Sequence, residues 1–328
     1  MSDVPLLNIV DLVKHFPLGG GILAKPKGWV KAVDGVSFAV SRGESFGLVG
    51  ESGCGKSTLG RLILGLLEPS GGRIEFDGQN IGSLKAAEMM PLRRRMQIIF
   101  QDPFSSLDPR MKIDAIVTEP LRAIQPLTRN QRRAAAAELL EKVGLRKYDL
   151  NKYPHEFSGG QRQRIGIARS LCVRPELIVA DEPVSALDVS IQAQVINLLD
   201  DLKKEFSLSY VFISHDLSVV EHICDRIAVM YLGRVVEPAK TADFSESPRQ
   251  PYTRALLLAV PIPDPHRRVE PFPIEGDVAS PIDSPTGCAF HPRCPYAFDR
   301  CFQEKPALIE AADAHFVACW LNEGEGMK

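Results

Sequence analysis

Short apolar runs alternate with helical patterns along most of the chain. Runs that predict strands lie at residues 32–40, 46–49, 73–76, 96–99, 177–180, 210–213, 227–230 and 234–237. Apolar residues recur at helical spacing in residues 131–143 and 189–206. The run at 177–180 is apolar throughout, as expected for a strand covered on both faces. This alternation predicts an α/β fold built on a parallel sheet with helices on its faces.

Two stretches depart from the alternation. Residues 6–16 alternate loosely, which predicts an edge strand, and the next predicted strands follow through turns instead of helices. We therefore expect an antiparallel β layer that precedes and flanks the parallel sheet. From about residue 102 to 170 the pattern is mainly helical, which predicts a helical subdomain.

The composition changes after about residue 245. Twelve of the 25 prolines and four of the seven cysteines fall between residues 246 and 328. We expect a large α/β domain over residues 1–245 and a small, loop-rich extension over residues 246–328. Because the extension has little regular apolar pattern, we expect it to form little core and to need a stabilising device of its own.

Composition and charge narrow the class of protein. Hydrophobic residues make up 45% and charged residues 24% of the chain, as in soluble globular proteins. The formal net charge of −2 provides no general basic field for nucleic acid or anionic lipid. The first residues lack a charged segment followed by an apolar core, and no run of about 18 apolar residues occurs. We therefore expect no secretory signal, no membrane span and cysteines kept reduced in the cytosol.

The strongest motif is a phosphate loop between a predicted strand and a predicted helix. It comprises Gly50, Glu51, Ser52, Gly53, Cys54, Gly55, Lys56 and Ser57, followed by Thr58. Its glycines let consecutive N–H groups face phosphate oxygens, and the following helix adds the positive end of its dipole. Lys56 is expected to reach the β- and γ-phosphates, and the Ser57 hydroxyl to bind Mg²⁺. The motif predicts a binding site for a nucleoside triphosphate.

Two acids follow the apolar strand at 177–180. Asp181 is expected to be the carboxylate that serves Mg²⁺, directly or through water, and Glu182 can accept a proton from the attacking water. Ser158 can cap a helix and, with the glycines after it, expose N–H groups and a hydroxyl to a second anion. The chain is therefore expected to hydrolyse the nucleotide that it binds.

These motifs together resemble an ATP-binding-cassette (ABC) ATPase over residues 6–237. The resemblance rests on the phosphate loop, residues 157–161, residues 177–182 and His215. It implies a P-loop NTPase fold of the ABC type, with a mixed sheet core, an antiparallel β layer and a helical subdomain. It implies that Gln101 contacts Mg²⁺ and senses the γ-phosphate. It also makes His215 the switch histidine of the family and places Asp188 in the loop that crosses the dimer.

The resemblance also assigns a signature that acts on ATP held by the opposite subunit of a head-to-tail dimer. Its residues are Ser158, Gly159, Gly160 and Gln161. Phe157 stands before them, where leucine is commonest in the family. Phe16 occupies the place of the aromatic that stacks on adenine, with Trp29 as the alternative.

The extension narrows the family further. Residues 247–257, 259–265, 287–295 and 315–319 resemble the C-terminal extension of peptide-importer ATPases. The phosphate-loop region is most similar to the second of the two ATPases in oligopeptide and dipeptide importers. The resemblance implies an ATPase that drives bacterial uptake of di- or oligopeptides from the cytoplasmic face of the inner membrane. Implied partners are a second, non-identical ABC ATPase, two membrane permeases and an extracytoplasmic solute-binding protein.

Other readings differ in cargo or in class. Similar importers carry nickel, glutathione or sugars, so the sequence does not identify the solute. It also does not decide between a homodimer and a heterodimer, or whether both ATP sites hydrolyse ATP. ABC ATPases that act on nucleic acid or ribosomes carry long coiled coils or two cassettes, and this sequence has neither pattern, so no nucleic-acid partner is expected. A nucleotide-binding regulator without hydrolysis would lack Glu182 or His215, and both are present.

Four cysteines in the extension form a candidate metal site. Cys288, Cys294, Cys301 and Cys319 are separated by five, six and seventeen residues. Four thiolates suit zinc or an iron–sulfur cluster, although zinc ligands usually pair at shorter intervals. The family resemblance favours a [4Fe–4S] cluster, with Zn²⁺ and four unligated thiols as alternatives. The role would be structural, because the extension holds none of the predicted hydrolytic residues.

Overall fold

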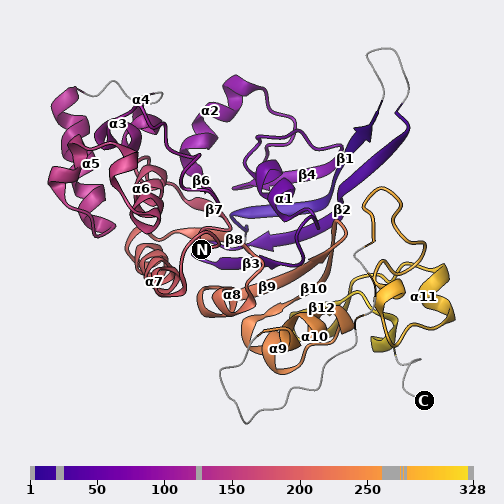
Figure 1. Ribbon diagram of the computed structural model, residues 1–328. Helices are drawn as coiled ribbons and strands as arrows, with labels where there is room; N and C mark the ends of the chain where they lie inside the picture. Colours follow the sequence, from indigo (N-terminus) through magenta and orange to yellow (C-terminus); the bar gives the residue numbers. More distant parts are fainter. Residues whose placement is uncertain are drawn as a thin grey trace, which may run out of the picture. The chain divides into compact units, whose positions relative to one another are not determined.

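The computed structural model describes residues 4–19, 26–122, 128–260, 274, 276 and 279–323 (Figure 1). The chain divides into two compact units. The first comprises Met1–Val40, Ser45–Ser83 and Ser214–Lys328, and the second comprises Ser41–Glu44 and Leu84–Ile213. The phosphate loop and His215 belong to the first unit, and the predicted acids and signature belong to the second.

The first unit contains the expected antiparallel layer, with strand order β2-β1-β4-β5. Its strands are β1 (Leu7–Leu18), β2 (Gly28–Val40), β4 (Gly71–Phe76) and β5 (Gln79–Asn80). Strand β1 pairs with β2 on one side and with β4 on the other. The prediction of an edge strand is therefore wrong. The loose alternation has another cause, because Asp11 takes a φ of 45° at a shift in the strand register.

The remaining strands of the first unit surround the start of the phosphate loop. Strand β3 (Ser45–Val49) runs parallel to β9 (Arg226–Tyr231), which forms the predicted hairpin with β10 (Arg234–Lys240). All five residues of β3 are buried. Helix α8 (Leu217–Ile223) packs directly on this strand, because a Cβ at Gly47 would lie 2.2 Å from Val220 Cγ1. The loop thus leaves a strand that is fixed on both sides.

The C-terminal extension lies in the first unit and shares its core with β9 and β10. Helix α9 (Thr241–Glu246) precedes it, and its elements are α10 (Pro251–Leu258), α11 (Asp299–Gln303), β11 (Ile309–Ala312) and β12 (His315–Val317), drawn from orange to yellow in Figure 1. Ala318 N–H donates to Val236 O at 2.8 Å beside β10. The rings of Tyr252 and Phe290, both buried, pack against Tyr231 with centroids 4.7 and 5.5 Å away. The expectation of a core-poor extension is wrong.

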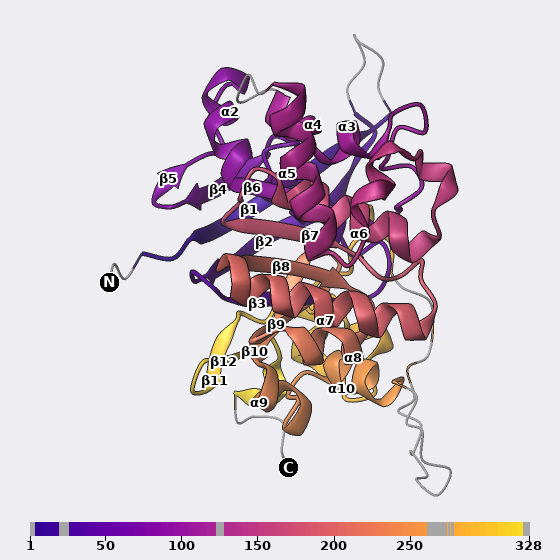
Figure 2. The same ribbon diagram turned by 90° about the vertical axis from the view of Figure 1, so that its left-hand side faces the viewer.

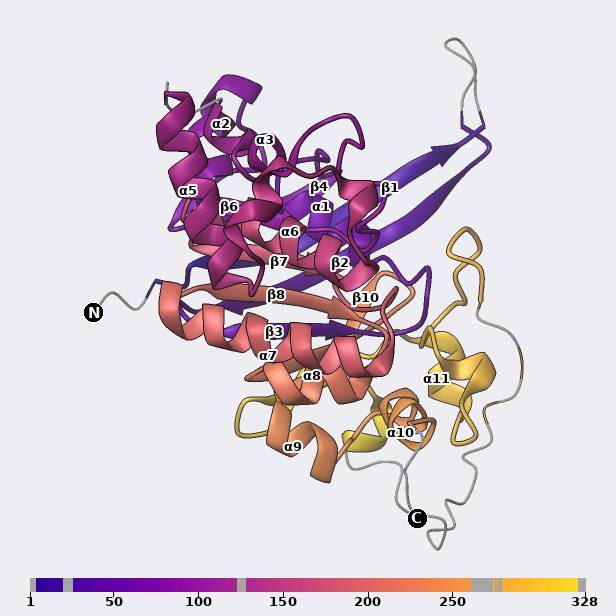
Figure 3. The same cartoon turned by 60° about the vertical axis from the view of Figure 1, so that its left-hand side comes forward.

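The second unit is built on a parallel sheet. Strands β6 (Met96–Ile99), β7 (Leu177–Asp181) and β8 (Ser209–Ser214) pair in that order, with Ile99 opposite Ala180. Helix α7 (Val189–Phe206) runs along β8, as Figures 2 and 3 show, and Tyr210 Oη donates to Leu199 O at 3.2 Å. All five residues of β7 are buried, as its apolar sequence predicts.

The expected helical region is also present in the second unit. It follows α2 (Ala86–Arg95) and β6, and contains α3 (Ile113–Val117), α4 (Glu119–Arg122), α5 (Arg129–Lys142) and α6 (Gly159–Leu171). Short 3₁₀ helices at Lys147–Asn151 and Pro154–Glu156 join α5 to α6. Arg164 Nη1 donates to Val143 O at 2.8 Å, which ties α6 to the end of α5. The described helices include none long and apolar enough to cross a membrane.

Candidate nucleotide site

The phosphate loop follows β3 and ends in α1 (Lys56–Ile63). Gly50 and Gly55 have φ values of 148° and 107°. A Cβ would lie 2.2 Å from Met230 O at Gly50 and 1.9 Å from Ala32 O at Gly55. Only glycine satisfies both the left-handed conformation and the close approach of the neighbouring backbones. The loop conformation is therefore fixed by the strands around it.

Lys56 lies inside the loop, with 5% of its surface exposed. Its Nζ donates to Gly50 O at 2.7 Å and to Glu51 O at 2.9 Å. Burial raises the pKa of the Cys54 thiol, although the nearby Lys56 ammonium opposes this shift. The loop thus concentrates a positive charge at the start of a helix, which is the arrangement that an anion requires.

The extension reaches this loop at Glu51. The Glu51 N–H donates to the Tyr252 hydroxyl at 2.9 Å. Arg293 Nη1 and Nη2 donate to the Glu51 carboxylate at 2.8 and 3.0 Å, and this pairing raises the pKa of Arg293. The sequence did not predict these contacts. An acid in the loop and a basic residue in the extension were visible, but no local pattern pairs residues 242 positions apart.

His215 and the phosphate loop line the same pocket. The pocket has a volume of about 310 Å³, and Val49, Gly50 and His215 are among its lining residues. Helix α10 of the extension contributes Leu256 to the lining, and Val260 follows the helix. His215 is exposed and directly precedes Asp216, whose carboxylate caps α8. Within the first unit, the predicted switch histidine is therefore brought beside the loop.

In the second unit, the predicted acids lie at the end of β7. Asp181 is the last residue of the strand and is 9% exposed. Glu182 has a φ of 46°, which is uncommon for a residue with a side chain, and its N–H donates to Ile213 O at 2.9 Å. Gln101 Nε2 donates to Glu182 Oε2 at 2.8 Å. The sequence-predicted sensor and the predicted base are therefore joined by a direct hydrogen bond.

The signature forms the start of α6. Ser158 caps the helix, with its Oγ accepting from Gln161 N–H at 3.3 Å and its N–H donating to Gln161 Oε1 at 3.0 Å. Ser158 is exposed and Gly159 is partly exposed, so both are accessible to an external anion. Gly160 packs against Ile191 of α7, whose Cγ2 would lie 2.5 Å from a Cβ at Gly160.

Asp188 lies at the N-cap of α7 and is exposed. Its carboxylate accepts from Ser190 Oγ at 2.8 Å and from Ile191 N–H at 3.0 Å, and these hydrogen bonds lower the pKa of Asp188. Ile191 therefore contacts both the signature helix and the residue predicted to cross the dimer. The structure brings these two predicted features together through one residue, whose side chain faces Gly160 and whose backbone N–H donates to Asp188.

The two candidate adenine-stacking residues lie on neighbouring strands. Phe16 of β1 is opposite Val30, and Trp29 of β2 is opposite Pro17. Cross-strand partners share a face and successive residues alternate, so Phe16 and Trp29 project from opposite faces of the sheet. Phe16 is half-buried and Trp29 is 49% exposed. Only one of them can therefore face a given nucleotide.

The four cysteines of the extension are reduced thiols in a common environment. Burial raises the pKa of Cys288 to about 11 and that of Cys319 to about 12, and the Cys288, Cys294 and Cys301 thiols add to the shift at Cys319. Cys288 N–H donates to Cys301 O at 2.9 Å. Among the residues that the structure describes, no three His, Cys, Asp or Glu side chains are arranged to hold a metal ion. The cluster assignment stays a prediction.

Comparisons with known proteins identify the family of the chain. A family model described as ABC transporter matches residues 33–185, and one described as the C-terminal region of oligopeptide/dipeptide transporters matches residues 236–301. A probable peptide ABC transporter ATP-binding protein, y4tS of Sinorhizobium fredii, is 52% identical over 97% of this chain and 90% of its own length. The oligopeptide transport ATP-binding protein AppF of Bacillus subtilis is 50% identical over 96% of this chain and 97% of its own length.

Solved structures give the same family. The ATP-binding cassette MJ0796, solved as a dimer bound to ADP and phosphate, has a TM-score of 0.65 and 28% identity, covering 72% of this chain and 98% of that one. The cbiO1 protein of Clostridium perfringens, part of the ABC transporter complex cbiONQ, has a TM-score of 0.63 and 28% identity, covering 74% of this chain and 91% of that one. The chain belongs to the ABC transporter ATPases, in the subfamily of oligopeptide and dipeptide transporters.

Proposed function

We propose that this chain binds and hydrolyses ATP to drive the bacterial uptake of di- or oligopeptides. The observation that carries this proposal is the match of the extension to the oligopeptide/dipeptide transporter region, together with peptide-transport relatives that align along nearly the whole chain. An importer of the same construction for nickel, glutathione or a sugar is the alternative. We assign the choice of cargo to the partner proteins of the importer.

The chain's own residues supply the chemistry of hydrolysis. Lys56 and the N–H groups of the loop hold the phosphates, and Glu182 accepts a proton from the attacking water while Gln101 orients its carboxylate. The side chains that would hold Mg²⁺ are Ser57, Gln101 and Asp181, whose oxygens suit this hard cation. Mg²⁺, when bound with ATP, supplies charge neutralisation at the phosphates. We assign the role of switch to His215, which lines the same pocket as Gly50 of the phosphate loop.

The assembly follows from the position of the signature. Ser158 and Gly159 are accessible at the start of α6, so they can bind ATP held by a second ABC ATPase in a head-to-tail dimer. We assign that place to a non-identical paralogue. Two membrane permeases and an extracytoplasmic solute-binding protein complete the importer, and the chain sits peripherally on the cytoplasmic face of the membrane. We keep residue 245 as the boundary between the ATPase domain and the extension.

Residues 102–109 are the segment that we assign to permease docking. Phe104 is 58% exposed, and the Arg162 guanidinium lies 4.2 Å from its ring centroid. Leu107 is only 1% exposed, so it anchors the segment and cannot itself reach a partner. A photo-cross-linker at Ser105, which is exposed, should react with a permease loop in the assembled complex. Cross-links confined to other surfaces would refute this assignment.

The test of hydrolysis is phosphate release from the complete importer. Glu182→Gln should reduce turnover by about 10²–10⁴-fold while ATP binding persists, because only the proton acceptor is lost. Lys56→Ala should weaken ATP binding itself. Glu176→Gln is the matched control, since Glu176 directly precedes β7 and Glu182 directly follows it. Turnover of Glu182→Gln at the parental rate would refute the assignment of the base.

The solute is tested by uptake and by stimulation of ATPase activity. The complete importer should respond to di- and oligopeptides in the presence of its binding protein. Stimulation by Ni²⁺, glutathione or a sugar alone would exclude peptides as the cargo and leave the ATPase assignment intact.

We also propose that the four cysteines of the extension hold a [4Fe–4S] cluster with a structural role. Support comes from their number, from their soft sulfur chemistry and from the influence of the Cys288, Cys294 and Cys301 thiols on the pKa of Cys319. Anaerobically purified protein should be brown and contain about four irons per chain. Colourless protein with one zinc would replace iron with zinc at the same ligands. A folded extension with neither metal would refute both assignments.

A further inference from the structure

The C-terminal extension holds one residue of the phosphate loop, Glu51, through two separate side chains. Arg293 donates from both terminal nitrogens to the two carboxylate oxygens of Glu51, in the fork geometry that makes arginine–carboxylate pairs strong. Tyr252 accepts the backbone N–H of the same residue. Both the main chain and the side chain of Glu51 are thus tied to the extension.

The two side chains that hold Glu51 are themselves fixed by packing. Tyr252 is fully buried and the Arg293 side chain is 9% exposed. The rings of Tyr231, Tyr252 and Phe290 pack together, with centroids between 4.7 and 5.5 Å apart. Phe290 begins the turn that ends at Arg293, whose N–H donates to Phe290 O at 3.0 Å. The aromatic cluster therefore sets the position of the guanidinium.

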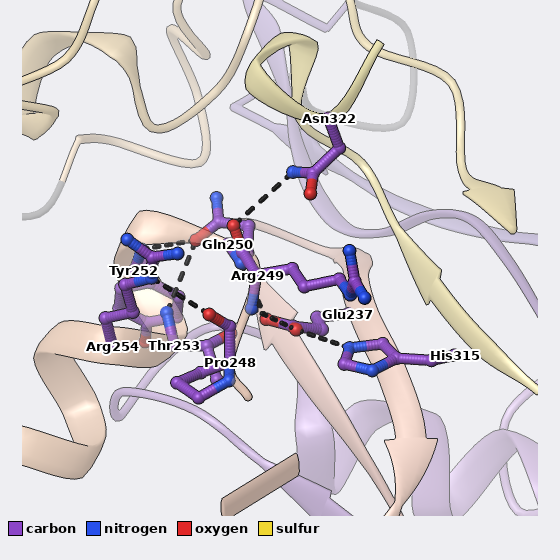
Figure 4. Close-up of polar contacts among 9 residues, drawn as sticks. All are labelled: Glu237, Pro248, Arg249, Gln250, Tyr252, Thr253, Arg254, His315 and Asn322. Atoms are coloured by element: carbon purple, nitrogen blue, oxygen red, sulfur yellow. Dashed lines mark hydrogen bonds and ion pairs between the residues drawn. The ribbon is translucent and has the colours of Figure 1, made fainter. Parts of the chain in front are cut away.

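A buried carboxylate fixes the start of α10, which carries Tyr252 (Figure 4). Glu237 of β10 is fully buried and accepts from Arg249 N–H at 2.7 Å and from Gln250 N–H at 3.0 Å. Its Oε1 also forms a hydrogen bond with His315 Nε2 at 2.7 Å. The Gln250 side chain in turn accepts from the Tyr252 N–H. The chain of contacts thus runs from β10 through α10 to the phosphate loop.

A carboxylate in a phosphate loop is unfavourable for an anionic ligand. Two like charges in a partly buried site repel each other, and the repulsion grows as solvent screening decreases. The Glu51 side chain is 27% exposed, so water screens it only in part. Arg293 supplies the opposite charge at hydrogen-bonding distance. The nucleotide site therefore includes a charge that comes from the extension.

We propose that Arg293 is a positioning residue for nucleotide binding. It neutralises and holds Glu51, so that the phosphate loop accepts a nucleoside polyphosphate only when the extension is docked against it. This inference rests on the nucleotide site proposed above. Its test measures nucleotide binding instead of hydrolysis, so a failed assignment of Glu182 would leave it standing.

The test is a double-mutant cycle on the full-length chain, with MgADP affinity measured by isothermal titration calorimetry. Arg293→Gln should weaken MgADP binding by about tenfold, because it leaves the Glu51 charge uncompensated. In the Glu51→Gln background the same substitution should cost less than about twofold, because no charge then needs compensation. Arg293→Lys should lose about threefold or less, since lysine keeps the charge without the fork.

Arg300→Gln is the matched control in the extension. Arg300 also pairs with acids, Glu304 and Glu323, and lies 3.5 Å from the centroid of the Trp320 ring. This variant loses a comparable ion pair away from the loop and should bind MgADP within about twofold of the parent. Equal losses from Arg300→Gln and Arg293→Gln would show that only the stability of the extension matters, which overturns the proposal.

Two other outcomes also overturn it. Parental affinity in Arg293→Gln would show that the charge pair is irrelevant to the nucleotide. A tenfold loss that persists in the Glu51→Gln background would show that Arg293 acts independently of Glu51. If Arg293→Gln fails to fold, Arg293→Lys is measured with and without Glu51→Gln: its smaller loss should disappear in the Glu51→Gln background, and a loss that persists there would overturn the proposal.

Discussion

Gly160→Ala is the substitution for which the structure gives the most direct magnitude. A Cβ at this position would lie 2.5 Å from Ile191 Cγ2, about 1 Å closer than carbon atoms at their optimal separation. Ile191 is branched at Cβ and stiff about χ1, so its methyl group cannot easily rotate away. Helix α6 must then shift from α7. Overpacking of this kind costs about 1–3 kcal/mol of the free energy of unfolding.

Gly166 provides the control in the same helix. No atom lies within 4 Å of a Cβ placed there, so Gly166→Ala should stabilise the protein by about 0.5–1 kcal/mol through helix propensity alone. Urea unfolding of the full-length chain should give opposite shifts in midpoint for the two variants. Adding Ile191→Ala to Gly160→Ala should remove the clash and cost less than the two single changes combined. Gly160→Ala with parental stability, or strict additivity in the double variant, would refute the argument.

Two further substitutions each test one contact, the first in the first unit and the second in the second unit. Tyr252→Phe removes the acceptor of the Glu51 N–H and should destabilise the protein by about 1 kcal/mol in urea unfolding, whereas Tyr148→Phe, at an exposed hydroxyl, should have almost no effect. The hydrogen bond from Arg95 lowers the pKa of Glu176 below its ordinary value of 4.5. Glu176 therefore stabilises the fold above pH 4.5, and this contribution is lost as the pH falls through the lower pKa of the folded state. The stability difference between the parent and Glu176→Gln should therefore shrink between pH 6 and pH 3, and a difference that is constant with pH would contradict this.

The regular elements could be predicted because their signals are local. Helix α7 was expected over residues 189–206 and begins and ends there, since Asp188 caps an amphipathic stretch of 18 residues. The phosphate loop is one contiguous motif, and the Ser158 cap was also visible in a few neighbouring residues. Strand β1 was misplaced at an edge because a bulge at Asp11 disturbs its alternation, and alternation alone cannot report how many neighbours a strand has.

The tertiary contacts of the extension could not be predicted for the opposite reason. Its aromatic residues are scattered and show no helical or strand period, so the sequence does not reveal that Tyr252 and Phe290 share a core with Tyr231. The pairing of Glu51 with Arg293 spans 242 positions. A contact of this kind depends on where two elements meet in three dimensions, and neither residue has a local pattern that identifies its partner.

Two of the contacts that hold the extension have different consequences for the nucleotide site. Glu237, with its backbone N–H partners and His315, fixes α10 without any metal, so Tyr252 keeps its place whatever the cysteines bind. Arg293 directly precedes Cys294. If the cysteines hold a cluster, its loss would act first on the turn that carries the guanidinium. The charge of Glu51 would then be uncompensated while its main chain stayed anchored. A measurement of nucleotide affinity should therefore report the state of the cysteine site more directly than a measurement of the stability of the fold.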